Sequence, residues 1–271
     1  NKVQVFNDVR REGAMNICVT GGAGFIGSHL VDRLIELGHD VLVIDNLSTG
    51  MRSFVHEDAQ FIEMDVRDPK LLSVFEEFKP TIVFHEAAQT MVQSSMENPS
   101  YDCDVNLIGL INVLDACRKV NVEQFLMPSS AAVYGDLAVL PLTEDLSGMP
   151  SSFYGLTKLT AEGYLRIYHE AFGLNTVCFR YANVYGPRQG DGGEGGVISI
   201  FNRLIVEGQP LTVFGDGEQT RDFIYVDDVV DANIKAMGNG QCTGIYNIST
   251  NKGTSVNELI TRFRTISGTD F

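Results

Sequence analysis

From Met15 onward the chain alternates short apolar runs with longer amphipathic ones. Short runs rich in β-branched residues predict buried strands, and segments with helical spacing that end before a glycine predict helices. The predicted strands cover 16–20, 40–44, 60–64, 81–85, 124–128 and 176–180, and the predicted helices cover 25–37, 69–78, 103–119 and 153–172. This alternation predicts an α/β fold with a doubly wound parallel sheet and helices on both faces.

Composition and charge exclude several classes of function. The formal net charge of −15 argues against nucleic acid or an anionic membrane as a partner. No apolar run approaches the roughly 20 residues that a membrane span needs. The five cysteines are scattered without metal-ligand spacing, which fits a reducing cytoplasm better than a disulfide framework or a metal site. We expect a cytoplasmic protein with no metal centre.

A glycine-rich turn at 20–27 (TGGAGFIG) follows the first strand and opens the first helix. Gly21 permits the tight turn, Gly24 lets the backbone approach a pyrophosphate, and Gly27 lets helix and strand pack closely. Asp45 follows the second strand, where its carboxylate can accept hydrogen bonds from an adenosine ribose. Because that carboxylate would repel a 2′-phosphate, the pattern predicts NAD rather than NADP. The alternative is that Asp45 caps a turn beside ordinary loop glycines.

Local residue composition divides the chain into regions. Residues 15–182 are predicted to form an NAD-binding Rossmann domain, to which a strand near 245–250 returns. Residues 183–271, dense in Gly, Pro and charge, are predicted to form a smaller substrate-binding region that is truncated at its C-terminal end. The Gly-rich stretch 190–196 is interpreted as a mobile cover, and residues 1–14 as an N-terminal extension or cloning remnant.

Tyr154 and Lys158 lie on one face of a predicted helix, because they are four residues apart. An ammonium near a phenol stabilises the phenolate, so we expect a lowered pKa for Tyr154. The tyrosine would then take a hydroxyl proton while a nicotinamide takes hydride from the same carbon. Such pairs are common by chance, but Ser130 at a strand end adds a third group where open α/β sheets bind ligands. Ser129 or Ser130 in isolation would be a turn residue.

Seven motifs then occur in order: TGGAGFIG, Asp45, HEAA at 85–88, SSAAVYG at 129–135, YGLTK at 154–158, RYANVYGPRQ at 180–189 and GDGEQTRDFIYVDDV at 215–229. Together they resemble extended short-chain dehydrogenases/reductases, and within these the UDP-glucose 4-epimerase family. The resemblance runs from Met15 to about Ile260. It implies a Rossmann fold with a smaller C-terminal substrate-binding region, NAD as cofactor and a nucleotide sugar, a UDP-hexose, as substrate.

The resemblance also implies roles for individual residues. The implied catalytic residues are Ser130, Tyr154 and Lys158. The implied cofactor contacts are Phe25 and Ile26 at the pyrophosphate, Asp45, Asn46, Ser48 and Gly50 around the ribose, Asp65 and Val66 at the adenine, Ala87, Ala88 and Gln89 along the floor, and Tyr181 near the nicotinamide. The implied substrate contacts are Asn183 at the diphosphate, Val197, Thr212, Val213 and Phe214 at the nucleoside, and Arg221 at a phosphate. A surface salt bridge with Asp222 or Glu218 is the alternative for Arg221.

The residues after Ser130 bear on the reaction. Sugar-nucleotide 4,6-dehydratases typically carry an Asp-Glu pair where this chain has Ala131 and Ala132, so elimination of water lacks its acid and base. The resemblance therefore implies interconversion of UDP-glucose and UDP-galactose at C4 through a 4-keto intermediate. Ala132 departs from the Thr of many epimerases, which weakens one substrate hydrogen bond.

Two other classes of function stay open. One is another sugar-nucleotide enzyme of the same class, such as a reductase, a dehydratase or a different epimerase. The other is a non-catalytic NAD-binding regulator, which we would expect to have lost Tyr154 or Lys158. The resemblance also implies a homodimer that pairs the helices at 103–119 and 153–172.

Overall fold

The computed structural model of the chain describes residues 13–190 and 196–268. The predictions for the N-terminal stretch 1–14, for the Gly-rich cover and for the C-terminal end therefore lie largely or wholly outside the described residues.

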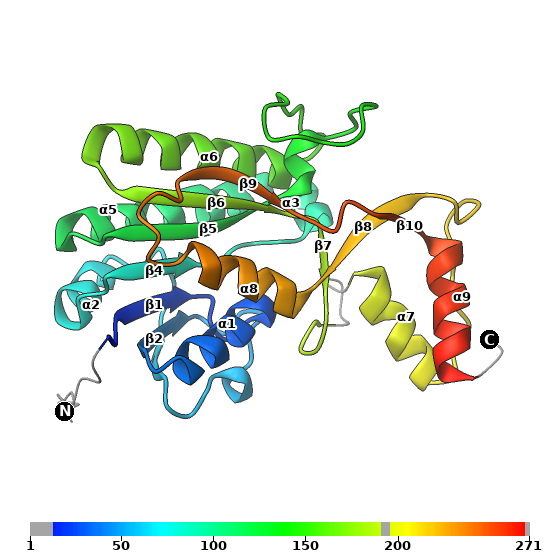
Figure 1. Ribbon diagram of the computed structural model, residues 1–271, viewed down its shortest axis with the longest axis horizontal. Helices are drawn as coiled ribbons and strands as arrows, with labels where there is room; N and C mark the ends of the chain where they lie inside the picture. The colour runs from blue at the N-terminus through cyan, green and yellow to red at the C-terminus, as the bar shows by residue number, and fades with distance from the viewer. Residues whose placement is uncertain (1–12, 191–195, 269–271) are drawn as a thin grey trace.

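A seven-stranded sheet forms the centre of the fold, in the order β3-β2-β1-β4-β5-β6-β9 (Figure 1). Its strands are β1 (Asn16–Thr20), β2 (Asp40–Asp45), β3 (Gln60–Glu63), β4 (Ile82–His85), β5 (Gln124–Ser130), β6 (Asn175–Tyr181) and β9 (Gly244–Ile248). All neighbouring strands pair in parallel. The doubly wound sheet is confirmed, and its strand order reverses between β1 and β4, where such sheets bind ligands.

Helices cover both faces of this sheet. Helices α2 (Leu71–Phe78), α5 (Leu110–Val120) and α6 (Phe153–Phe172) bury one apolar cluster, which includes Phe75, Leu114 and Leu165. Helices α1 (Phe25–Glu36) and α8 (Val226–Ala236) bury the other and lie side by side (Figure 1). Helix α8 therefore packs on the main sheet although it comes from within residues 183–271.

Capping residues explain where the predicted bounds of a helix agree with the structure and where they differ. Helix α6 has the predicted bounds because Ser152 Oγ accepts a hydrogen bond from Gly155 N at 3.1 Å and Gly173 is left-handed at its end. The predicted helix at 103–119 is wrong at its start. Three segments form one longer helical run there: α4 (Pro99–Cys103), the π-helix η2 (Asp104–Gly109) and α5. Asn98 caps this run by accepting from Tyr101 N.

A second, three-stranded sheet lies beyond the carboxyl edge of the main sheet (Figure 1). Strands β7 (Asn183–Tyr185) and β8 (Thr220–Tyr225) pair in parallel, and β10 (Gly253–Ser255) pairs antiparallel to β8. Helices α7 (Val197–Val206) and α9 (Val256–Ser267) stand outside it and meet through Phe201 and Phe263, whose ring centroids are 6.3 Å apart. In the described part of the chain, no helix combines the length and apolarity needed to cross a bilayer.

Candidate active site

One cavity of about 890 Å³ opens along the carboxyl edge of the main sheet and extends to the second sheet. Every catalytic, cofactor-binding and substrate-binding residue named from the sequence borders it, from Gly21 at the end of β1 to Arg221 on β8. The fold therefore brings together side chains that lie 200 positions apart. Their individual roles remain predictions.

The glycine turn at the start of α1 is packed too tightly for larger residues. Gly21 has φ +72°, and a Cβ there would lie 2.5 Å from Ala87 N. A Cβ on Gly27 would lie 2.3 Å from the Gly21 carbonyl oxygen. Gly24 is the N-cap residue of α1 and has no side chain that could cap the helix. The first turn of α1, which borders the cavity, therefore has backbone N–H groups that no N-cap side chain bonds. This cradle fits a dinucleotide pyrophosphate.

Asp45 lies at the end of β2 and is 8% exposed. Its Oδ2 accepts from Ala23 N at 3.0 Å, and its Oδ1 accepts from Leu47 N at 2.8 Å. The carboxylate thus fastens the glycine turn and caps its own turn, while each oxygen keeps acceptor capacity for a ribose hydroxyl. The two interpretations of Asp45 are compatible.

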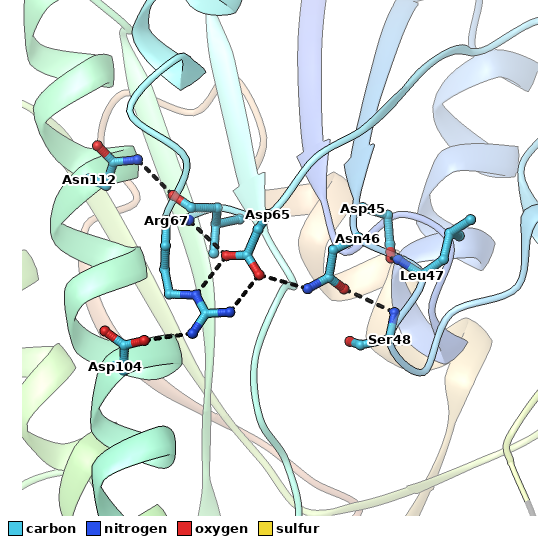
Figure 2. Close-up of polar contacts among 9 residues, drawn as sticks. Asp45, Asn46, Leu47, Ser48, Asp65, Arg67, Asp104 and Asn112 are labelled. Carbon is cyan, nitrogen blue, oxygen red and sulfur yellow. Dashed lines mark hydrogen bonds and ion pairs between the residues drawn. The ribbon is translucent and has the colours of Figure 1, made fainter.

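The part of the cavity beside Asp45 and Asp65 carries a charged network that the sequence did not indicate (Figure 2). Arg67 binds Asp65 through Nε at 2.8 Å and Nη2 at 2.7 Å, and it also pairs with Asp104 of η2. Asn46 Nδ2 donates to Asp65 at 2.8 Å. The Arg67 guanidinium holds the pKa of Asp65 well below its ordinary value. Asp104 lies 37 positions from Arg67, so no local pattern links the two.

The three expected catalytic side chains meet at one wall of the cavity. Ser130 ends β5, and its Oγ accepts from Ala132 N at 3.1 Å. Tyr154 and Lys158 face the cavity from the first turns of α6. Lys158 Nζ donates to the Pro128 carbonyl at 3.0 Å and lies 6.0 Å from the Tyr154 ring centroid.

The expected lowering of the Tyr154 pKa is wrong for this structure. Burial, opposed by a hydrogen bond with Ser130 and aided by the Asp102 carboxylate, raises the pKa of Tyr154 to about 12. Burial also lowers the pKa of Lys158 itself.

The HEAA motif places two titratable residues behind this wall. Burial lowers the pKa of His85 to about 3, and its Nδ1 lies 2.8 Å from Thr20 Oγ1, so the ring is neutral. Burial raises the pKa of Glu86 to about 7, and Lys158 opposes that rise. Among the described residues, Glu86 Oε1 is buried without a hydrogen-bond partner. Glu86 borders the cavity, although no feature of the sequence pointed to a role for it.

The residues that the resemblance assigns to the substrate lie on the second sheet, on α7 and on the segment after α7. Asn183 begins β7, and its Nδ2 donates to the Asp222 carbonyl at 3.1 Å. Arg221 is exposed on β8 and donates to the Thr220 carbonyl at 2.8 Å. A salt bridge from Arg221 to Asp222 or Glu218 is not found within the described ranges. The Asp222 carboxylate instead accepts hydrogen bonds from the N–H and hydroxyl of Thr250 and from the backbone N–H of Lys252. The same ranges contain no group of three His, Cys, Asp or Glu placed to hold a metal ion.

Known proteins resemble this chain over most of its length. The family model described as the NAD dependent epimerase/dehydratase family matches residues 17–249. The UDP-glucose 4-epimerase of Mycolicibacterium smegmatis is 40% identical over 253 residues, which are 91% of this chain and 81% of that protein.

Solved structures agree with the sequence comparison. The crystal structure of the Thermotoga maritima UDP-glucose 4-epimerase with UDP-glucose is similar at a TM-score of 0.91 and 42% identity, covering 95% of this chain and 84% of that one. The Thermus thermophilus UDP-glucose 4-epimerase complex with NAD is similar at a TM-score of 0.89 and 40% identity, covering 94% and 84%.

Proposed function

The chain belongs to the NAD dependent epimerase/dehydratase family, and on that premise we propose that it interconverts UDP-glucose and UDP-galactose at C4. The observation that carries the proposal is the position of Ser130, Tyr154 and Lys158 on a cavity that also takes in the dinucleotide turn and Arg221. The two epimerase structures, one with UDP-glucose and one with NAD, support the same pair of ligands.

The residues present fit NAD. In this proposal the backbone of Phe25 and Ile26 binds the pyrophosphate, Asp45 accepts from the ribose, and the segment at Asp65 and Val66 lies at the adenine. The chemistry that NAD supplies when bound is reversible uptake of the C4 hydrogen with its electron pair, together with a positive charge that favours the phenolate of Tyr154.

The chain's own residues handle the proton and the orientation of the sugar. Tyr154 Oη takes the proton of the sugar 4-hydroxyl and later returns it, while Ser130 hydrogen-bonds the same oxygen. Lys158 spends one of its three N–H groups on Pro128 and offers the others to hydroxyls in the cavity. Arg221 and Asn183 hold the diphosphate while the 4-keto sugar turns to present its opposite face.

Dehydration is the weaker alternative. Ala131 and Ala132 follow Ser130 in η3 (Ala131–Tyr134) and have no titratable group. Elimination of water needs an acid and a base placed at the sugar ring, whereas epimerisation asks of the protein's side chains only the proton exchange at the 4-hydroxyl, since NAD would supply the exchange of the C4 hydrogen with its electron pair.

A cytoplasmic homodimer completes the proposal. Large apolar side chains are exposed on the helical run 99–120 and on α6, among them Ile108, Leu156 and Ile167, each close to half exposed. Such a patch is typical of a helix-to-helix interface. Sedimentation should give twice the 29.8 kDa chain mass for the wild type and less for Leu156→Asp.

The compartment is proposed from the cysteines. The five unpaired cysteines favour a reducing compartment.

Incubation of NAD-loaded protein with UDP-glucose, followed by separation of the nucleotide sugars, tests the proposed reaction. We expect UDP-galactose as the product. Tyr154→Phe should keep NAD and lose at least about a hundredfold in rate. Tyr164→Phe, on the same helix, is the matched control and should keep activity. Unchanged turnover in Tyr154→Phe removes that residue from the mechanism, and a 4-keto-6-deoxy product identifies a dehydratase.

A further inference from the structure

A fully buried carboxylate lies behind the catalytic helix. Asp102 of α4 has a relative exposure of 0%. Its oxygens accept from Gln89 Nε2 at 2.6 Å, from Asn106 Nδ2 at 3.1 Å and from Thr157 Oγ1 at 2.8 Å. All three partners donate, which fits an ionised carboxylate. No ion pair of Asp102 occurs in the described part of the chain, so its hydrogen bonds all come from neutral donors.

Each partner of Asp102 belongs to a different part of the active site. Gln89 borders the cavity, and it exchanges two backbone hydrogen bonds with the Asn106 side chain, at 2.9 and 3.0 Å. Thr157 lies between Tyr154 and Lys158 on α6, and its Oγ1 also contacts the Tyr154 carbonyl at 3.0 Å. Asp102 therefore joins the wall of the cavity at Gln89 to the turn of α6 that carries Tyr154 and Lys158.

The helix geometry supports a specific purpose for this cluster. Asn106 lies within the π-helix η2, which interrupts an otherwise α-helical run directly after Asp102. Single π-turns inside α-helices are rare and are found mostly at functional sites. Here the π-turn carries the side chain that links Asp102 to the backbone of Gln89.

The charge of Asp102 also acts on the catalytic pair. Its carboxylate raises the pKa of Tyr154, where burial is the larger cause and Ser130 acts in the opposite direction. It likewise raises the pKa of Lys158, as Cys178, Glu86 and Glu162 also do against the lowering by burial. Each effect keeps a proton on the group concerned.

We propose that Asp102 is a positioning residue: it orients Tyr154 and Lys158 through Thr157 and ties them, through Gln89, to the wall of the cavity. This inference rests on the proposed epimerase function. It assigns a positioning role to a carboxylate that takes no part in the proton exchange itself.

Two substitutions separate the charge from the hydrogen bond. Asp102→Asn keeps the shape, since the amide oxygen can accept from Gln89 and Asn106 while the amide NH₂ donates to Thr157 Oγ1. It removes only the charge. Thr157→Val keeps the charge but removes the link to α6, and Thr157→Ser restores that link. Asp115→Asn, a partly exposed acid on α5, is the matched control.

Kinetics with UDP-glucose test the positioning. We expect kcat to fall by about tenfold in Thr157→Val, with KM changed less than about twofold, because misplacement of reacting groups lowers kcat. Thr157→Ser and Asp115→Asn should retain wild-type kcat, and Asp102→Asn, which keeps the hydrogen bonds, should lose less than Thr157→Val. Wild-type kcat in Thr157→Val overturns the positioning.

A titration that needs no turnover tests the charge. In NAD-loaded protein labelled with ¹³C at lysine Cε, the Lys158 resonance is identified by its absence in Lys158→Met. Its midpoint should fall by at least about 0.5 pH units in Asp102→Asn and stay unchanged in Thr157→Val. An unchanged midpoint in Asp102→Asn overturns the effect of charge. If no variant and no wild type converts UDP-glucose, the proposed function fails, and this titration still decides whether Asp102 acts on Lys158.

Discussion

Glu86→Gln should stabilise the protein at pH 8 and leave its stability unchanged near pH 4.5. Burial raises the pKa of Glu86 from the ordinary 4.5 to about 7 in the folded chain. The folded protein therefore holds this proton in a pH range where the unfolded chain has lost it. Stability from this carboxyl falls as pH rises from about 4.5 to about 7, and it stays at the lower value above that range.

The size of the effect follows from the same interval. A pKa difference from 4.5 to about 7 corresponds to about 3 kcal/mol. Because the residue as a whole is only half-buried, solvent screening reduces this, and we expect about 2 kcal/mol. His85, whose pKa is lowered to about 3, gives an opposite slope below pH 6.5, but it is present in both proteins and cancels in the difference.

Urea unfolding of NAD-free wild type and Glu86→Gln at pH 5 and pH 8 measures this difference. Glu97→Gln, an exposed acid on α3 (Val92–Glu97), is the control and should match wild type at both pH values. A stability difference between Glu86→Gln and wild type that is the same at pH 5 and pH 8 refutes the reasoning.

Three further substitutions test the cofactor cradle, the diphosphate contact and the core. Gly27→Ala should weaken NAD binding by at least about tenfold in calorimetry, because its methyl group meets the Gly21 carbonyl at 2.3 Å; unchanged affinity contradicts the cradle. Arg221→Met should raise KM for UDP-glucose by about tenfold or more with a smaller change in kcat, as steady-state kinetics will show. Glu162→Gln should cost about 3 kcal/mol or more in urea unfolding, because it leaves the Arg180 guanidinium, 4% exposed, without its counterion.

The sheet was predictable because its central strands are buried on both faces. Parallel strands covered by helices consist of short continuous apolar runs, such as Ile17–Val19, which precedes Thr20 and Gly21, and Val41–Ile44, which precedes Asp45. The turn chemistry was equally local: Ser152 and Gly173 mark both ends of α6. These signals place the carboxyl ends of the strands along one edge, which is why the expected site residues border one cavity.

The missed features depend on contacts that no local pattern contains. The π-turn at 104–109 keeps apolar residues at near-helical spacing, so periodicity alone predicts an ordinary helix. The Arg67–Asp104 pair and the Asp102–Thr157 hydrogen bond join residues far apart in the chain. The pKa of Tyr154 was misjudged because spacing shows that Lys158 shares its helix face, but it does not show that the phenol is buried, which raises the pKa.

Deuterium at C4 of UDP-glucose offers the most direct measurement of the central claim. If Tyr154 exchanges only the hydroxyl proton while the carbon-bound hydrogen leaves and returns without exchange with solvent, the UDP-galactose formed keeps deuterium at C4. Mass spectrometry with NMR will find it there. Loss of the label to solvent, or a product that does not differ from UDP-glucose at C4, contradicts this account.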